Sequence, residues 1–457
     1  MSIGVADERS VGGVPGRRMS LRDGEWLSCD HIRVVGPLAG VTAPVIRETL
    51  IALHRQHPEH GSVCRLDRAS RRWVPQSSAE YAYLTNTDVE VLDWPEPGTP
   101  EAVAVAAARA AGERVGTAPH EVATAEALRE ALIALELGDR PLKVLVCGDF
   151  VGIRMSHAIG DGQVFNSLAT EIFGAGAAGR APRLPFPRPT RLPLARASLR
   201  FFGRAPRRAL TLLRTPRPVL PQPAGNEPRR AWQPEVCATY ARSDTGTLGA
   251  VRKWRDAHLP GTSIAALLFA ATTPAFEACG LRPDGAGLMI LFDARRYLGR
   301  GATVDGNFSP GEYLVPASTL DPQAIHGVMN AMVESGWPLA SLALRDVYAL
   351  RPGARHVPGP TRVRVQSSPA LTLTHIGRLD ERYGGLPWAC VPENRMVLSA
   401  PTPAGPEAVT VTFAELAGVL HLNLTFHRST FDEKAMRRVA ELICADPVGL
   451  IEERSPS

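Results

Sequence analysis

In the first half of the chain, apolar residues recur first at helical spacing and then in short runs typical of strands. The helical pattern comprises Ile46, Leu50 and Leu53. Thr42 precedes it as an N-cap candidate, and a second helix is expected over residues 122–137. Two apolar runs then flank Gly148-Asp149, which is typical of two strands joined by a tight turn. This order predicts a mixed α/β half.

The second half repeats this alternation of helix and strand. A helix is expected over residues 263–271, and buried strands are expected at 288–296 and 371–377. Two alternating segments flank Ala417-Gly418, which predicts a hairpin. A capping-box match at 430–433 is expected to open a last helix. The pattern therefore predicts two α/β halves of similar make-up.

A basic segment separates these halves. Thirteen arginines lie between Arg180 and Arg230, together with many prolines and a single acidic residue, Glu227. We therefore divide the chain into an N-terminal half (20–178), a crossover rich in arginine and proline (179–234) and a C-terminal half (235–450). With 457 residues, of which 44% are hydrophobic, the chain is long enough to bury two cores.

Composition and cysteine spacing argue against several classes of protein. The seven cysteines are scattered and never spaced as CxxC, which fits a reducing compartment without structural zinc. Three histidines recur between residues 54 and 60, but Pro58 interrupts the helix on which they would hold a metal. The net charge of +5 is modest, and the apolar run at 264–276 is too short to span a bilayer. No secretory signal opens the sequence, so we expect a soluble, cytoplasmic monomer that does not bind nucleic acid.

The sequence MSHAIGDG, residues 155–162, ends the second predicted strand and leads directly into a helical pattern at 163–173. Such a strand-to-helix corner holds a side chain rigidly at the edge of a domain. One interpretation is structural, with Asp161 as an N-cap and the glycines allowing a tight backbone. The alternative is that His157 directs Nε2 toward a channel and removes a proton from an alcohol or an amine.

The segment HAIGDG resembles the HxxxDG signature of the acyltransferases related to chloramphenicol acetyltransferase, a superfamily that includes condensation domains of nonribosomal peptide synthetases and polyketide-associated acyltransferases. Residues 50–74 resemble the early helix that ends in an Arg-His-Pro-like sequence. FDARRYL and VDGNF resemble the stretch with Asp-x-Arg and a later Gly-Asn-Phe, and THIGRL resembles the Ser-Asn-x-Gly region of condensation-like enzymes. The resemblance covers nearly all of residues 25–445 outside the basic crossover.

The sequence departs from this family pattern at two places. Condensation domains usually carry two histidines in tandem, whereas Ser156 precedes His157 here. The second histidine is the one implied in catalysis, so this change keeps the base but weakens an assignment to amide-forming peptide synthesis. The nearest match to the Asp-Phe-Gly-Trp-Gly element of the plant branch is DERYGGLPW, which argues against close kinship with that branch.

The resemblance implies roles for four residues around the corner. His157 would be the general base, and Gly162 would offer a backbone N–H to the oxyanion of the tetrahedral intermediate. Asp161 would pair with Arg295 of the FDAR segment across the two halves and shape the corner.

Three further positions have weaker assignments. Ser156 would be a structural support at the first histidine position. Asn307 and Thr374 would line the substrate tunnel, although the alternative for Asn307 is a turn residue beside Gly306.

The expected fold is thus α/β, with two chloramphenicol acetyltransferase-like sandwich halves in a pseudo-twofold arrangement around a central tunnel. The expected activity is transfer of an acyl group from a thioester donor, an acyl-CoA or an acyl or peptidyl carrier protein, to a small-molecule alcohol or amine. No metal or redox cofactor is implied, and the context would be natural-product or lipid biosynthesis. Two alternatives stay open: a catalytically silent module that recruits a partner protein, and a condensation-fold enzyme that performs cyclisation.

The basic crossover has three interpretations. It can be a solvated connection between the halves. Its charge can attract an acidic carrier protein or the phosphates of coenzyme A. Leucine and aromatic residues alternate with arginine in it, so it can also form a helix at a membrane surface.

Overall fold

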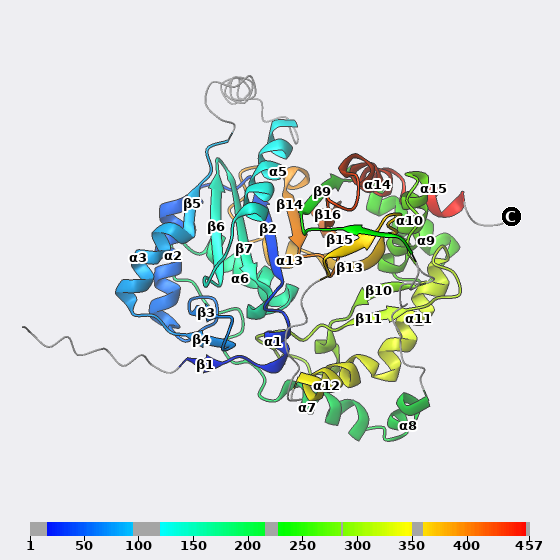
Figure 1. Cartoon of the computed structure of the whole chain (residues 1–457), viewed down its shortest axis with the longest axis horizontal. Coiled ribbons are helices and arrows are strands. Elements are labelled where there is room, and N and C mark those ends of the chain that lie inside the picture. Colours follow the sequence, from blue (N-terminus) through cyan, green and yellow to red (C-terminus); the bar gives the residue numbers. More distant parts are fainter. Residues whose placement is uncertain (1–15, 95–118, 215–226, 285–286, 350–359, 454–457) are drawn as a thin grey trace, which may run out of the picture.

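Two β-sheets form the centres of two lobes that lie side by side in the computed structural model of the chain (Figure 1). The structure describes residues 16–94, 119–214, 227–284, 287–349 and 360–453. The start of the chain (1–15) and part of the basic crossover (215–226) therefore lie outside the described residues.

The first lobe is built on a five-stranded sheet with the order β14-β2-β7-β6-β5. Its strands are β2 (Asp30–Gly36), β5 (Val89–Val91), β6 (Leu142–Cys147), β7 (Phe150–Ser156) and β14 (Met396–Pro401). Its main helices are α2 (Ala43–Gln56), α3 (Ser78–Asp88), α5 (Pro119–Ala134) and α6 (Gly162–Gly174). β6 and β7 form the antiparallel pair predicted about Gly148-Asp149.

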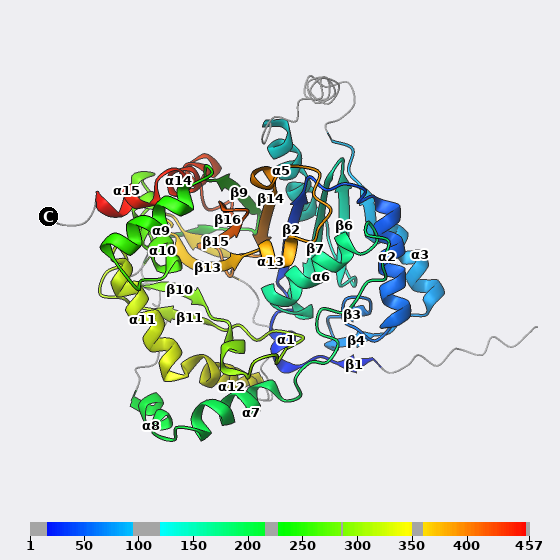
Figure 2. The ribbon, with the colours of Figure 1, turned by 180° about the vertical axis from the view of Figure 1, so that it is seen from behind.

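Alternation along β2 gives this sheet two buried faces. Ile32 and Val34 belong to a core cluster that contains residues of α5. Val35 belongs to a second cluster with Ile46 of α2 and Leu168 of α6. The view from behind shows α6 and α2 crossing this second face (Figure 2). The strand that ends at Ser156 is therefore held between two layers of helix.

The second lobe is built on a six-stranded sheet with the order β11-β10-β13-β15-β16-β9. Its strands are β9 (Val236–Arg242), β10 (Leu288–Leu291), β11 (Gly311–Leu314), β13 (Ala370–Arg378), β15 (Ala408–Leu416) and β16 (Val419–His427). Its helices are α9 (Thr247–His258), α10 (Ile264–Ala278), α11 (Pro322–Ser335), α12 (Trp337–Ala349), α14 (Glu433–Ala445) and α15 (Pro447–Glu452). The predicted hairpin is present, with Ala417 and Gly418 at φ values of 53° and 77° between β15 and β16.

Short elements flank and connect the lobes. The strands among them are β1 (Arg17–Arg18), β3 (Arg65–Asp67), β4 (Arg72–Val74), β8 (Arg229–Ala231) and β12 (Arg362–Arg364). The helices are α1 (Leu21–Glu25), α7 (Pro193–Ser198), α8 (Arg207–Arg214) and α13 (Asp380–Tyr383). Single turns are η1 (His157–Ile159), η2 (Leu199–Gly203), η3 (Ala294–Tyr297) and η4 (Pro392–Asn394). The chain crosses to the second lobe through α7, η2 and α8, and it returns to the first sheet through β14, which pairs with β2.

Two local predictions differ from the structure. The capping-box match places the helix start at Thr430, but Asp432 is the N-cap of α14 and accepts a hydrogen bond from the N–H of Ala435. Thr430 instead accepts a hydrogen bond from the indole of Trp232. The strand predicted at 288–296 ends at Leu291, because Asp293 caps the 3₁₀ turn η3 that follows.

Candidate functional site

The chain turns from β7 into α6 at a corner formed by residues 156–162, each of which has a defined place in it. β7 ends at Ser156, and the single turn η1 carries His157. Gly160 comes next, where a Cβ atom would lie 2.6 Å from Cβ of Val164, so only glycine fits. Asp161 then caps α6 by accepting a hydrogen bond from the N–H of Gln163 at 3.1 Å. The predicted strand-to-helix corner is therefore present.

Hydrogen bonds from both halves of the chain hold the backbone of His157. Its N–H donates to the carbonyl oxygen of Cys29 at 2.9 Å. Its own carbonyl oxygen accepts from Nδ2 of Asn307, also at 2.9 Å. The backbone N–H and Nδ2 of Asn307 each donate to Oδ1 of Asp23 at 2.9 Å. Asn307 thus connects the backbone of His157 to Asp23 of α1.

Two aromatic rings pack against the imidazole of His157. The centroids of the Trp26 and His31 rings each lie 4.1 Å from it, with interplanar angles of 14° and 33°. Nδ1 of His157 is buried, although the residue keeps part of its surface accessible. Nε2 is therefore the candidate ring nitrogen for contact with a substrate.

Burial determines the protonation state of both histidines. It lowers the pKa of His157 from its usual value, and the nearby Asp161 charge opposes this effect without cancelling it. Burial, followed by the nearby His157, places the pKa of His31 well below the usual value. A neutral imidazole accepts protons, so the arrangement suits a general base at neutral pH.

The carboxylate of Asp161 is turned toward the second lobe. Oδ2 accepts hydrogen bonds from Nη1 of Arg295 at 2.7 Å, from the N–H of Phe308 at 2.9 Å and from the hydroxyl of Ser309 at 2.8 Å. Burial acts to raise the pKa of Asp161, but the charge and hydrogen bonds of Arg295 outweigh it and the pKa is lowered. The described residues show no hydrogen bond between this carboxylate and the His157 ring.

The first two residues of α6 differ in what they contact. A Cβ atom on Gly162 would meet nothing within 4 Å, so packing does not demand glycine at this position. Nε2 of Gln163 donates to Asp293 at 3.1 Å, and its Oε1 accepts from Arg382. Gln163 therefore forms a second link between the corner and the second lobe, one that the sequence did not indicate.

The two remaining candidates from the sequence, Ser156 and Thr374, differ in how near they lie to His157. Ser156 is buried, and its Oγ accepts the N–H of Ala158 at 3.4 Å, which is a local cap. Thr374 lies within β13 opposite Thr412, and no contact among the described residues joins it to His157. The sequence did not indicate Trp26, His31 or Asp23 as neighbours of His157.

Among the described residues, no group of three or more His, Cys, Asp or Glu residues is arranged to hold a metal ion.

Comparison with known proteins identifies the fold. No family model and no curated protein matches the chain. The trichothecene 15-O-acetyltransferase TRI3 from Fusarium sporotrichioides matches with a TM-score of 0.55 at 12% identity, over 94% of this chain and 95% of that one. The first condensation domain of the CDA synthetase matches with 0.52 at 15% identity, over 97% and 99%. SgcC5 from Streptomyces globisporus matches with 0.52 at 14% identity, over 95% and 98%.

These matches confirm the expected mixed α/β fold, while the pseudo-twofold arrangement and the central tunnel stay predictions. The chain has the mixed α/β fold of the chloramphenicol acetyltransferase-like acetyltransferases and condensation domains. At 12–15% identity the likeness shows the fold alone.

Proposed function

We propose that this chain, which has the fold of acetyltransferases and condensation domains, transfers an acyl group from a thioester to a hydroxyl or amine group. The observation that carries the proposal is His157: a neutral, partly accessible imidazole held by backbone hydrogen bonds at a rigid corner. A general base of this kind needs a fixed position and a pKa that leaves it unprotonated at working pH.

The proposed reaction has two proton transfers. Nε2 of His157 takes the proton from the acceptor hydroxyl or amine as its oxygen or nitrogen attacks the thioester carbonyl carbon. The tetrahedral intermediate then collapses, the carbon–sulfur bond breaks, and the protonated His157 returns the proton to the leaving thiolate. The products are an ester or amide and a free thiol. This chemistry needs no metal or redox group.

Two other features of the corner have supporting roles. The N–H of Gly162, at the N-terminus of α6, donates a hydrogen bond to the oxyanion of the intermediate. The Asp161–Arg295 pair acts through structure, because the Asp161 carboxylate is engaged by the second lobe. The donor, an acyl-CoA or an acyl-carrier protein, and the acceptor approach the corner through a tunnel between the lobes.

The test is incubation of the purified chain with acyl-CoA and carrier-bound thioesters of varied acyl chain length, together with a mixture of small alcohols and amines. Release of thiol is followed with a thiol-reactive dye, and products are identified by mass. Thiol release that needs an acceptor, with acylated acceptor formed in equal amount, supports the proposal. Release without an acceptor, with a product that has cyclised, identifies the cyclisation alternative. No release across acyl-CoA and carrier-bound donors favours a silent module.

A further inference from the structure

The segment between the two lobes carries apolar side chains that are exposed among the described residues. We define the crossover surface as the outer face of residues 191–214, which contain α7, η2 and α8. Its four exposed leucines, with the accessible fraction of each, are Leu192 (77%), Leu199 (74%), Leu210 (56%) and Leu213 (82%). They are the most exposed leucines among the described residues, since the next are Leu344 at 41% and Leu291 at 37%. Exposed apolar side chains that are concentrated in one segment are typical of an interaction surface.

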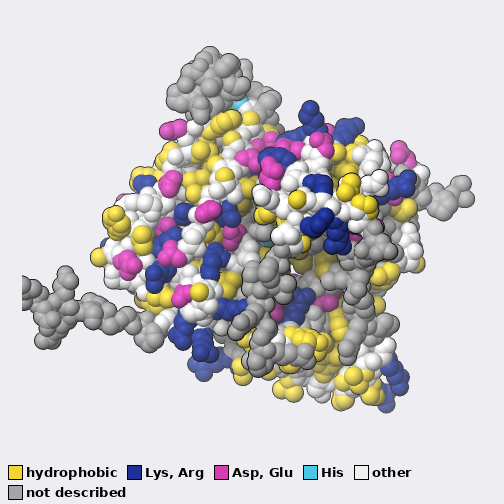
Figure 3. Space-filling model, in the orientation of Figure 1, with side chains coloured by type: hydrophobic (Ala, Val, Ile, Leu, Met, Phe, Trp, Pro, Cys, Tyr) yellow, Lys and Arg dark blue, Asp and Glu magenta, His cyan; other side chains and the backbone are white. Residues whose placement is uncertain are grey.

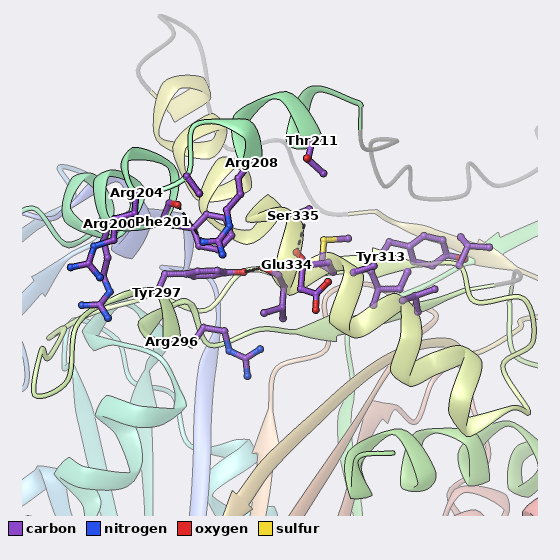
Figure 4. A pocket seen from close by; sticks show the side chains of 17 residues that line it. Arg200, Phe201, Arg204, Arg208, Thr211, Arg296, Tyr297, Tyr313, Glu334 and Ser335 are labelled. Carbon is purple, nitrogen blue, oxygen red and sulfur yellow. Dashed lines mark hydrogen bonds between the residues drawn. The ribbon is translucent and has the colours of Figure 1, made fainter. Parts of the chain in front are cut away.

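The two exposed leucines of α8 lie away from the pocket beneath this helix. On its inner side, Arg208 and Thr211 line a pocket of about 1560 Å³ that extends to Ser335 of α11 (Figure 4). The Arg208 guanidinium lies 4.5 Å from the centroid of the Phe201 ring there. Leu210 and Leu213, three residues apart on the helix, do not line this pocket. α8 has no buried residue, so its outer face has no partner in the described part of the chain.

Positive charge is concentrated in the same segment as the leucines, although Arg200, Arg204 and Arg208 line the pocket on its inner side. Seven arginines lie between residues 191 and 214, where there is no acidic residue: Arg191, Arg196, Arg200, Arg204, Arg207, Arg208 and Arg214. None of them forms an ion pair with a described carboxylate. On α8, Arg207 and Arg214 flank Leu210 at helical spacing. Hydrophobic and basic atoms lie together at the lower right edge of the molecule, where α8 lies (Figure 3).

The charge of the rest of the chain would orient the molecule at an anionic surface, with the crossover surface facing it. Residues 180–230 hold thirteen of the 51 basic residues and one of the 46 acidic residues. Acidic residues therefore outnumber lysine and arginine in the remainder of the chain. An anionic surface attracts the crossover and is repelled by the remainder, so the molecule would bind it in one orientation.

We propose that the crossover surface docks onto a lipid bilayer that contains anionic phospholipids. Leucines enter the apolar edge of the bilayer while the flanking guanidinium groups bind lipid phosphates. A soluble phosphate ligand would use the arginines but would leave four leucines in water. None of the four leucines lines the pocket, so their side chains stay available to a lipid layer. None of the helices in the described part of the chain has the length and apolarity to cross a bilayer, so the contact is peripheral.

The test is flotation of the full chain with lipid vesicles, and it does not depend on acyl transfer. We expect the protein to float with vesicles of equal parts phosphatidylcholine and phosphatidylglycerol. Binding to phosphatidylcholine alone should be weaker by about tenfold or more, and added salt should weaken binding to the mixed vesicles. A protein that stays in the soluble fraction with the mixed vesicles overturns the proposal.

Matched variants locate the surface. Leu210→Ser with Leu213→Ser, and separately Arg207→Gln with Arg214→Gln, should each weaken vesicle binding by about tenfold. The controls remove an exposed aromatic residue (Tyr83→Ser, 75% accessible) or two exposed arginines (Arg17→Gln with Arg18→Gln) from the first lobe, and they should bind as the unchanged protein does. Equal losses in controls and variants, or variants that bind fully, contradict the assignment. So does an Arg207/Arg214 variant that weakens coenzyme A binding while vesicle binding is unchanged.

Discussion

Nη1 of Arg295 lies 2.7 Å from Oδ2 of Asp161, a residue 134 positions earlier in the chain. Asp161 caps α6 in the first lobe, and Arg295 lies in η3 of the second. The guanidinium also donates to the carbonyl oxygens of Val304 and Gly306 at 3.0 and 3.1 Å, immediately before Asn307, which holds His157. One ion pair therefore joins the two lobes at the corner that carries the proposed base.

This pair should stabilise the fold. Asp161→Ala leaves Arg295 paired with Asp293 alone, at 3.3 Å, and Arg295→Ala leaves the buried Asp161 carboxylate with neutral donors. Breaking a buried ion pair costs about 3–5 kcal/mol of unfolding free energy, and the loss should be larger for Arg295→Ala. The double variant should lose less than the sum of the single losses, because the same interaction is removed only once. Urea denaturation measures all three. Strictly additive losses would show that the two residues do not depend on each other.

The N–H of Gly162 can be removed without changing the helix. Gly162 is the first residue of α6, a position that accepts proline, and Asp161 before it has the extended backbone that proline requires (φ −79°, ψ −175°). Gly162→Pro should lower kcat by about 10²- to 10³-fold. Gly162→Ala keeps the N–H and places a methyl group in open space, so it should retain activity. Equal rates in the two variants would exclude this N–H as an oxyanion donor.

Asn307 should act as a positioning residue. Asn307→Ala removes the hydrogen bonds from Nδ2 to the His157 carbonyl oxygen and to Asp23, while the backbone N–H keeps its hydrogen bond to Asp23. The imidazole then loses its alignment, so kcat should fall by about ten- to a hundredfold while KM for the donor changes little. Asn330→Ala, which removes an exposed asparagine on α11, is the matched control. A rise in KM with unchanged kcat would instead place Asn307 in substrate binding.

The lowered pKa of His157 sets the acid side of the pH profile. A free histidine titrates near pH 6.5, and burial holds the pKa of folded His157 below that value. kcat/KM should therefore reach half of its maximum at a pH below about 6.5. The unfolded chain binds more protons than the folded chain as the pH falls through about 6.5, so the free energy of unfolding should also fall there. A half-maximum of kcat/KM above about pH 6.5 would contradict a depressed pKa.

The corner could be predicted because its determinants are local. The strand that ends at Ser156, the cap at Asp161 and the helix after it all lie within a few residues of one another. The hairpins about Gly148-Asp149 and Ala417-Gly418 follow from alternation and turn residues in the same way. The partnership of Asp161 and Arg295 came from the family resemblance, and the structure contains it.

The surroundings of His157 depend on contacts between distant segments. Trp26 and His31 reach the imidazole because β2 pairs with β7, and a single sequence does not specify that register. Nothing local marks β14 as a strand of the first sheet either. Thr430 and Asp432 are both suitable N-cap residues for the last helix. Asp432 is the N-cap in the structure, and Thr430 instead accepts a tertiary hydrogen bond from Trp232. Sequence patterns thus indicated His157 as the proposed base but not the residues that surround its imidazole.

The most direct measurement of the proposed function compares His157→Ala with Ser156→Ala in single-turnover acyl transfer, with circular dichroism to verify the fold. The two residues are adjacent at the end of β7, but Ser156 only caps a local turn at 3.4 Å. The general-base mechanism predicts that Ser156→Ala stays close to the unchanged rate. It also predicts that His157→Ala loses about 10²- to 10⁴-fold with its fold intact. A well-folded His157→Ala protein that transfers acyl groups at the unchanged rate would contradict the mechanism.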